Sequence, residues 1–342
     1  MSSHVLTIVV PTYNMEKYLR KNLNSLAAVC KKEKIEVLII DNASSDNSGK
    51  IADEFANMDP ETFIVIHKEN YGYGSSINLA IKMAKGQYLR IVDADDWINP
   101  EELIELIQDL KKCTADLVIS NYIIIDIQNN TEVIVEMRPH GITEGNYYCI
   151  RDSSKPFPKM HSTIFSIEFL RKNKIFLLED TCYVDEQLML LACLYANSLV
   201  YYDHNVYCYR LGDANQSVSA TNMGKLYADR ERELKDCLTA YKRWTIMNGP
   251  MVPCLKQLIK HAGNHFTTLY MYVEPATVRP LLAKEWHTFL YTQWPEIAQK
   301  VAGKRWILAM LNKLHLDGKR YVVLHTMLEK LKMTLKKWRR IV

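Results

Sequence analysis

The chain has 342 residues, of which 48% are apolar, and a formal net charge of +4. This length exceeds one ordinary α/β domain and predicts two parts. The sequence contains neither a run of about 18 apolar residues nor a charged and apolar leader, which argues against a membrane-spanning or signal-directed protein. Its eight cysteines form no Cys-x-x-Cys pair, so we expect reduced thiols and a cytoplasmic location.

Up to about residue 130, short β-prone segments alternate with segments that carry apolar residues three and four apart. The expected strands are 5–10, 35–40, 63–67 and 88–92, and the expected helices are 16–31, 47–56, 75–84 and 100–112. Strict alternation predicts a mainly parallel sheet that is covered on both faces. Ligands of such sheets bind beyond the carboxyl ends of the strands.

A polar cluster follows each expected strand: Pro11–Asn14, Asp41–Asp46, Glu69–Asn70 and Asp93–Asp96. Because the carboxyl ends of parallel strands share one edge, the clusters together predict a nucleotide site. Taken singly, each has another explanation, since Asn, Asp and Ser are favoured in turns and at helix N-caps. Gly72-Tyr-Gly74 lacks the third glycine of a dinucleotide fingerprint, and we expect a turn into a helix on which Asn78 faces the ligand.

Three carboxylates, Asp93, Asp95 and Asp96, directly follow the fourth strand. Like charges this close need a cation, and their hard oxygens suit Mg²⁺ or Mn²⁺ bridging to a diphosphate. The alternative is that Asp95 and Asp96 cap the helix that begins at Pro100.

From about residue 222 the pattern is predominantly helical, and from Lys304 onward 11 Lys and Arg stand against 2 acids. Residues 321–342 place leucines at helical spacing among lysines, which predicts a basic amphipathic helix. This helix either lies on anionic lipid or packs its leucines on the protein. Nucleic acid is not an expected partner, because no stacking aromatics accompany the charge.

In combination these motifs resemble the family 2 glycosyltransferases, which have the GT-A nucleotide-sugar fold. The resemblance covers residues 4–220 and rests on Val10–Asn14, Asp41–Ser48, Asn70–Gly72 with Asn78, and Ala84–Asp96. It implies a catalytic domain over 1–220, with a nucleotide-binding half to about 130 and an acceptor half over 131–220. A helical region over 221–342 would follow, and it would hold the acceptor, form a homo-oligomer or bring the enzyme to the inner membrane face.

The resemblance also implies roles for single residues. Asp41 would contact the nucleotide base, and Pro11, Thr12 and Tyr13 would line the base and ribose pocket. Asp93 and Asp95 would form the pair that binds Mn²⁺ or Mg²⁺, with Asp95 as the direct ligand. The further nucleotide contacts would be Asn14, Asn70, Gly72, Asn78, Ala94 and Arg210. Ile77 stands where the family commonly has an arginine, which leaves one diphosphate contact unsupported.

Direct transfer to a sugar hydroxyl inverts the anomeric centre and needs a base for the acceptor proton. Tyr183–Leu188 resembles the base motif of the family, which implies Asp185; the alternatives are Glu186 as the base and Asp185 as a helix N-cap. His161 either bonds an acceptor hydroxyl or satisfies the core. The segment Tyr209–Ser219, with Arg210, Gln216 and Ser217, resembles the loop that folds over the diphosphate in the family.

We therefore expect a metal-dependent enzyme that moves a sugar from a nucleotide-sugar, UDP by family resemblance, to a glycan or lipid-linked acceptor in cell-surface polysaccharide synthesis. One alternative is a sugar nucleotidyltransferase, which usually has a Gly-rich basic loop that Pro11–Met15 lacks. The other is a silent glycan-binding scaffold, against which the acids Asp93, Asp95 and Asp185 argue.

Overall fold

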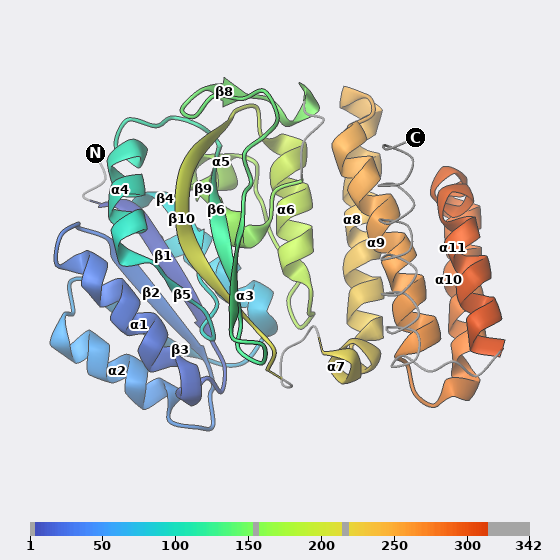
Figure 1. The fold of residues 1–342 in the computed structure, drawn as a ribbon, viewed down its shortest axis with the longest axis horizontal. Coiled ribbons are helices and arrows are strands. Elements are labelled where there is room, and N and C mark those ends of the chain that lie inside the picture. Colours follow the sequence, from blue (N-terminus) through green and yellow to red (C-terminus); the bar gives the residue numbers. More distant parts are fainter. Residues whose placement is uncertain (1–3, 153–156, 214–218, 314–342) are drawn as a thin grey trace, which may run out of the picture. The chain divides into compact units, whose positions relative to one another are not determined.

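The computed structural model describes residues 4–152, 157–213 and 219–313 (Figure 1). They belong to two compact units, Met1–Asp213 with Lys235–Leu255, and Ala214–Leu234 with Lys256–Val342. The predicted basic helix over 321–342, Gln216 and Ser217 lie outside the described residues. The predicted domain boundary at residue 220 stays a prediction.

The first unit is built on one mixed sheet in which the strand order is β3-β2-β1-β4-β9-β6-β10-β5, with β7 beside β6 and β8 beside β10. Neighbours from β3 to β4 pair in parallel, whereas β9 lies antiparallel between β4 and β6. The strands are β1 (His4–Thr12), β2 (Glu36–Asn42), β3 (Phe63–Lys68), β4 (Gly86–Ile91), β5 (Trp97–Ile98), β6 (Leu117–Asp126), β7 (Thr131–Val135), β8 (Tyr147–Tyr148), β9 (Thr163–Ser166) and β10 (Leu199–Leu211).

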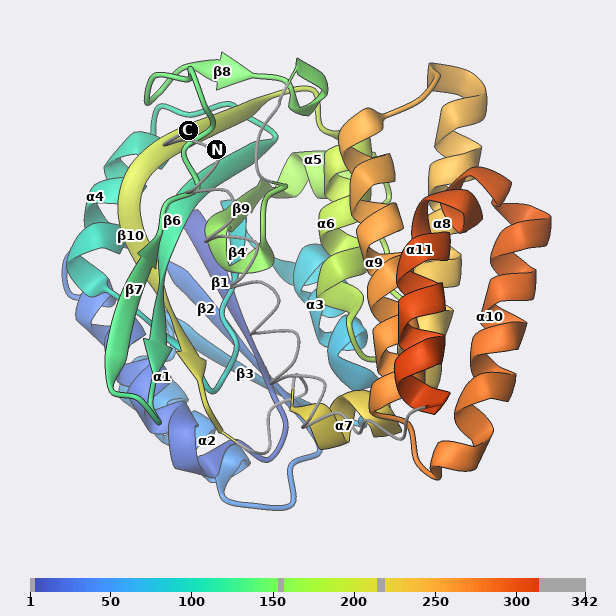
Figure 2. The same cartoon turned by 45° about the vertical axis from the view of Figure 1, so that its right-hand side comes forward.

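Helices cover both faces of this sheet (Figures 1 and 2). One face carries α1 (Glu16–Cys30), α2 (Ser48–Met58) and α4 (Pro100–Leu110), and the other carries α3 (Gly72–Met83), α5 (Ile167–Lys172) and α6 (Val184–Tyr195). Two short 3₁₀ helices, η1 (Ile150–Asp152) and η2 (Met160–Ser162), precede β9. The strands and helices predicted before residue 130 are confirmed, and so is the α/β fold class.

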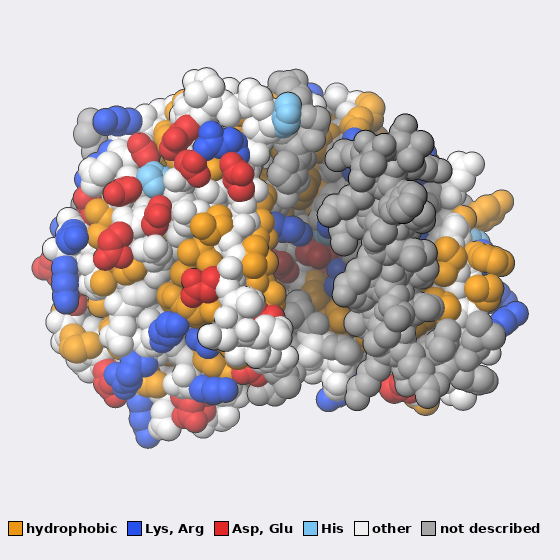
Figure 3. Space-filling view, in the orientation of Figure 1, with side chains coloured by type: hydrophobic (Ala, Val, Ile, Leu, Met, Phe, Trp, Pro, Cys, Tyr) orange, Lys and Arg blue, Asp and Glu red, His pale blue; other side chains and the backbone are white. Residues whose placement is uncertain are grey.

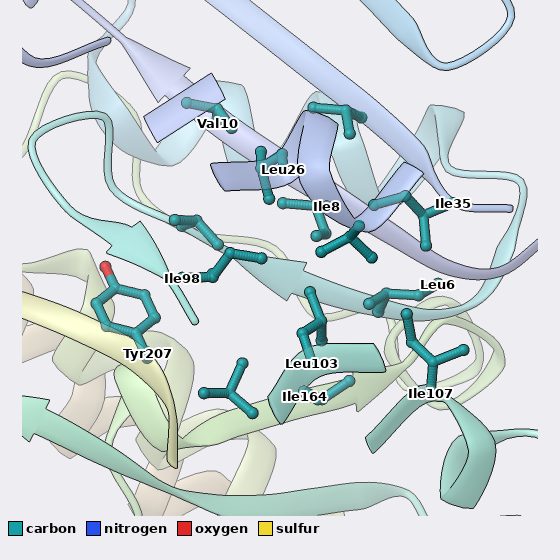
Figure 4. Close-up of a cluster of buried hydrophobic side chains, with 14 of the residues drawn as sticks. Leu6, Ile8, Val10, Leu26, Ile35, Ile98, Leu103, Ile107, Ile164 and Tyr207 are labelled. Atoms are coloured by element: carbon teal, nitrogen blue, oxygen red, sulfur yellow. The ribbon is translucent and has the colours of Figure 1, made fainter. Parts of the chain in front are cut away.

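The core of this unit follows from the two-residue period of its strands. Alternate residues of β1, Leu6, Ile8 and Val10, are fully buried and belong to one cluster with Leu26 of α1 and Leu103 of α4 (Figure 4). Each fully buried side chain of this size contributes roughly 1.5–3 kcal/mol relative to exposure. This packing fixes the depth at which each strand ends, and therefore where the polar clusters lie.

The second unit is helical. It contains α7 (Ala220–Lys225), most of α9 (Val252–Met271), α10 (Arg279–Gln293) and α11 (Pro295–Lys313), with η3 (Ala276–Val278) before α10; α8 (Tyr227–Asn248) contributes to both units. Buried His265 packs edge-on against Trp286, with ring centroids 5.0 Å apart. The helical C-terminal region is confirmed. Among the described residues, no helix combines the length and the apolar character needed to cross a membrane.

Charged side chains of both signs are interspersed over the exposed face of the first unit seen in Figure 3. On this face, acidic side chains gather around a histidine in the upper left of the view, and the basic side chains of the described residues form no continuous stripe. A surface of this kind does not present the basic stripe that nucleic-acid binding proteins carry.

Gly74 of α3 lies directly against the backbone of the segment before α6. A Cβ added at Gly74 would lie 2.1 Å from the carbonyl oxygen of Leu178, so the backbone would have to move. We expect Gly74→Ala to lower the free energy of unfolding by about 1–3 kcal/mol, measured by urea titration with circular dichroism. Gly303→Ala is the control, because a Cβ at Gly303 meets no atom within 4 Å. An equal effect of both substitutions would contradict this account.

Candidate active site

The acidic residues after β4 form a tight turn that α1 holds in place. The backbone N–H of Asp96 donates to the carbonyl of Asp93 at 3.0 Å. The side-chain amide of Asn22 donates to the carbonyls of both Asp93 and Asp96, each at 3.0 Å. Asn22 is buried on the apolar face of α1, beside Leu19 and Leu23. Sequence reasoning missed Asn22, although a polar residue on an apolar stripe was the available signal.

Asp93 is the centre of the site. The Tyr73 hydroxyl donates to Asp93 Oδ1 at 2.5 Å, and the Asp93 N–H donates to the Tyr207 hydroxyl at 3.1 Å. Burial, followed by the neighbouring charge of Asp95, raises the pKa of Asp93 to about 7. A bound cation would offset both causes. Tyr73 and Tyr207 were not predicted as site residues, because their contacts join segments far apart in the sequence.

The buried side chain of Asp96 fastens the acidic turn to β10. Its Oδ2 accepts a hydrogen bond from the Tyr207 hydroxyl at 2.6 Å, and its Oδ1 accepts one from the Arg210 N–H at 2.7 Å. Burial raises the pKa of Asp96 above its usual range. The N-cap of α4 is Asn99. The alternative that Asp95 and Asp96 cap this helix is therefore wrong.

His161 of η2 faces the same carboxylate. Its Nε2 lies 4.0 Å from Asp93 Oδ2, and its ring packs against Tyr209 and Tyr207 at centroid distances of 4.3 and 5.0 Å. Burial lowers the pKa of His161 to about 3, which leaves the neutral imidazole that binds metals. Buried Arg90 donates to the His161 carbonyl at 2.8 Å and so fixes this turn. His161 is thus half-buried, packs against aromatic rings and reaches the site.

Within the described part of the chain, Asp93, Asp96 and His161 form a group whose ligand atoms lie within 4.8 Å of one another. The resemblance implied Asp93 with Asp95 instead. Asp95 is half-buried in the same turn and is not a member of this group. The carboxylates of the acidic turn and the imidazole of His161 fit a divalent ion such as Mn²⁺.

The loops after β1 and β2 are joined where the nucleotide is expected. Pro11 and Thr12 are buried, and Tyr13 is exposed. Asn14 has a positive φ of 53°, and its side-chain oxygen accepts a hydrogen bond from the Ser45 N–H at 2.8 Å. Asp41, at the end of β2, accepts one from the Ser44 N–H at 3.0 Å. The structure thus brings the first two polar clusters together at one edge, and their nucleotide contacts stay predictions.

The third cluster connects α3 with the segment before α6. Asn70 accepts a hydrogen bond from the Gly72 N–H at 2.9 Å, and Gly72 has a φ of 76° that favours glycine. The Asn78 amide donates to the carbonyl of Leu177 at 3.0 Å and accepts from its N–H at 2.9 Å. These bonds give Asn78 a positioning role. A nucleotide contact of Asn70, Gly72 or Asn78 stays a prediction.

Arg210 lies in β10 against the acidic turn. Its Nε donates to the carbonyl of Asp95 at 2.8 Å, and its guanidinium lies 4.8 Å from the Tyr18 ring centroid and 5.0 Å from that of Trp97. Arg210 and buried Ala94 are thereby close to the metal candidates. Contact of either residue with a phosphate stays a prediction.

The predicted base lies in the first turn of α6. Asp185 is half-buried, and its negative charge contributes to the raised pKa values of Asp93 and Tyr73. The N-cap of α6 is Tyr183, with a φ of 65°, so the alternative of Asp185 as N-cap is wrong. Glu186 is the next residue of the same turn. The structure therefore brings Asp185 to the acidic site across about ninety residues of chain.

The family model described as "Glycosyl transferase family 2" matches residues 7–175. The glycosyltransferase GlyG of Streptococcus pneumoniae is 30% identical over 216 residues, which are 61% of this chain and 71% of GlyG. The putative glycosyltransferase EpsH of Bacillus subtilis is 38% identical over 122 residues, and the match spans 35% of its length. The match to GlyA of S. pneumoniae, 36% identical, spans only 16% of that protein.

The fold is also that of a solved relative. The structure of S. aureus TarS 1–349 in complex with UDP-GlcNAc superimposes with a TM-score of 0.52 at 20% identity, covering 91% of this chain and 92% of that one. At this identity the likeness concerns the fold alone. The mixed α/β sheet, the family match and the similarity to GlyG agree, and the chain belongs to the family 2 glycosyltransferases.

Proposed function

We propose that this glycosyltransferase is inverting and metal-dependent, and that it moves a sugar from a UDP-sugar to a hydroxyl of a glycan or lipid-linked acceptor in cell-surface polysaccharide assembly. The observation that carries the proposal is the acidic turn at Asp93, which has the neutral imidazole of His161 beside it and Asp185 near enough to raise its pKa. A polymeric acceptor is supported by TarS of Staphylococcus aureus, a poly(ribitol-phosphate) beta-N-acetylglucosaminyltransferase that is 37% identical over 98 residues.

We assign the divalent ion to Asp93 and Asp95, with His161 as a further ligand. Both oxygens of Asp96 already accept hydrogen bonds from Tyr207 and Arg210, which favours an anchoring role for that residue. A divalent ion held there would supply positive charge to offset the negative charge that develops on the departing nucleoside diphosphate. The hydroxyl of Tyr73 fixes the Asp93 carboxylate by its hydrogen bond to Oδ1.

Asp185 takes the proton from the acceptor hydroxyl during attack on the anomeric carbon. Its place in the first turn of α6 and its electrostatic effect on Asp93 support this role. In the proposed arrangement Asp185 faces the acceptor side of the donor sugar. Direct attack from that side inverts the anomeric centre. Arg210 and Tyr18 flank the diphosphate end of the site, where a guanidinium suits oxyanions.

Calorimetric titration with UDP, GDP, CDP and dTDP, each with and without Mn²⁺, tests the proposed donor site. We expect UDP to bind most tightly of the four nucleotides, and we expect its affinity to fall when Mn²⁺ is absent. Loss of tight binding on chelation with EDTA would confirm the metal dependence. Equal binding with and without Mn²⁺ would contradict the assigned metal site, and absence of binding by all four nucleotides would contradict the proposed donor.

A further inference from the structure

Asp41 and His67 form a side-chain pair that is built into the register of the sheet. They are direct partners in the parallel pairing of β2 with β3. His67 Nδ1 lies 2.9 Å from Asp41 Oδ2, while Asp41 Oδ1 accepts the Ser44 N–H at 3.0 Å. Both carboxylate oxygens of this buried residue are therefore held by the protein. The rotation of the carboxylate about its own axis is fixed.

The second ring nitrogen of His67 is also held by a carboxylate. Nε2 lies 3.1 Å from Oδ1 of Asp53 in α2. A neutral imidazole has one N–H and would turn a bare nitrogen toward one of the two acids, whereas the imidazolium donates to both. These two hydrogen bonds, with Asp41 first, raise the pKa of His67. The geometry thus favours the charged ring.

The first turn of α2 closes over the pair. A Cβ at Gly49 would lie 3.1 Å from Asp41 Oδ2 and 3.4 Å from His67 Cε1, so the helix backbone approaches as closely as a glycine allows. Such an approach leaves the Asp41 carboxylate little room to turn toward α2.

We infer that His67 is a positioning residue for nucleobase recognition, which holds the Asp41 carboxylate as a fixed hydrogen-bond acceptor. The inference rests on the proposed UDP-sugar donor and on the prediction that Asp41 contacts the base of that donor. A fixed carboxylate accepts the ring N–H of uracil, thymine or guanine. It faces a lone pair on the corresponding ring nitrogen of cytosine or adenine, and an unmatched buried acceptor is costly. His67 would therefore sharpen the choice of base without touching the nucleotide.

Three proteins test this inference: the wild type, His67→Phe and His67→Asn. The asparagine amide has a nitrogen near the position of Nδ1 and can keep the bond to Asp41, whereas phenylalanine keeps the ring shape and removes both bonds. Calorimetry in the presence of Mn²⁺ would measure Kd for UDP, for CDP and for inorganic pyrophosphate. Pyrophosphate has no base, so its binding reports any general damage to the site. Thermal midpoints would show that each variant is folded.

For the wild type we expect UDP to bind at least about tenfold more tightly than CDP, by the cost of an unmatched buried acceptor. His67→Phe should weaken UDP about tenfold, leave CDP and pyrophosphate within about threefold, and so abolish the preference. In His67→Asn the preference for UDP over CDP should return. Equal weakening of all three ligands, an unchanged UDP affinity in His67→Phe, or a wild-type preference for CDP would each overturn the inference. If the wild type bound pyrophosphate but no nucleoside diphosphate more tightly, the proposed donor would be wrong instead.

Discussion

Asp185→Asn is expected to lower the rate of sugar transfer by about 10²–10⁴-fold while Mn²⁺-dependent UDP binding stays within about threefold. Asparagine matches aspartate in shape, but its amide does not accept a proton at neutral pH. Because Asp185 lies in the first turn of α6, the substitution changes no residue of the β1–β4 edge, where the nucleotide and the metal are expected. Single-turnover transfer to an acceptor extract, followed by mass spectrometry, would measure the rate, and calorimetry would measure the affinity.

Glu186→Gln is the matched control, since it neutralises the next acid of the same turn. We expect this variant to keep its transfer rate within about tenfold, because a base that loses its carboxylate loses far more. The opposite pattern, with full activity in Asp185→Asn and none in Glu186→Gln, would move the base to Glu186. Full activity in both variants would place the base outside this turn.

Asp95→Asn is expected to weaken Mn²⁺-dependent UDP binding by at least about 10–100-fold, the range known for groups that merely support metal ligands. The loss of one negative charge removes both a ligand and part of the attraction for the ion. Transfer should fall with it. In EDTA, wild type and variant should bind UDP equally weakly, which separates a metal effect from damage to the nucleotide pocket. The Mn²⁺ affinity itself can be followed by electron paramagnetic resonance of the free ion.

Asp96→Asn provides the comparison, because the two acids are neighbours with different surroundings. Asp96 is buried and bound to Tyr207 and Arg210, so we expect a lower thermal midpoint and a smaller change in Mn²⁺ affinity than in Asp95→Asn. Glu101→Gln, an exposed acid in the first turn of α4, should change neither quantity. If Asp96→Asn released the metal and Asp95→Asn did not, the ion would belong to Asp93, Asp96 and His161.

The elements β1 to β4 and α1 to α4 were predictable because their signals are local. Each of these strands is a short, mainly apolar segment, and a helix follows each of them within a few residues. The strands β5 and β6, which also precede residue 130, were not predicted. The position of β9 between β4 and β6 was not predictable, because its partners lie far away in the sequence. The parallel pairing of β10 with β6 was not predictable for the same reason.

The acidic residues of the site were predictable by type, and their partners were not. Asp93 and Asp95 stand out because they belong to a cluster of acids that directly follows an apolar strand, and Asp185 was implied by the resemblance of its segment to the base motif of the family. The hydroxyls of Tyr73 and Tyr207 reach Asp93 from α3 and β10, and no spacing in the sequence indicates such contacts. His67 was read only as the end of a strand, since its pairing with Asp41 depends on the register of β2 with β3.

The bonds between α3 and the segment before α6 restrict how this protein can be altered. Asn78 holds both backbone groups of Leu177, the Asp180 N–H donates to the carbonyl of Tyr71 at 2.9 Å, and Gly74 leaves no space against Leu178. These contacts join α3 and the segment that leads to Asp185, so that neither can shift without the other. A chimaera that imports residues 176–186 from a relative to change its acceptor would have to import α3 as well.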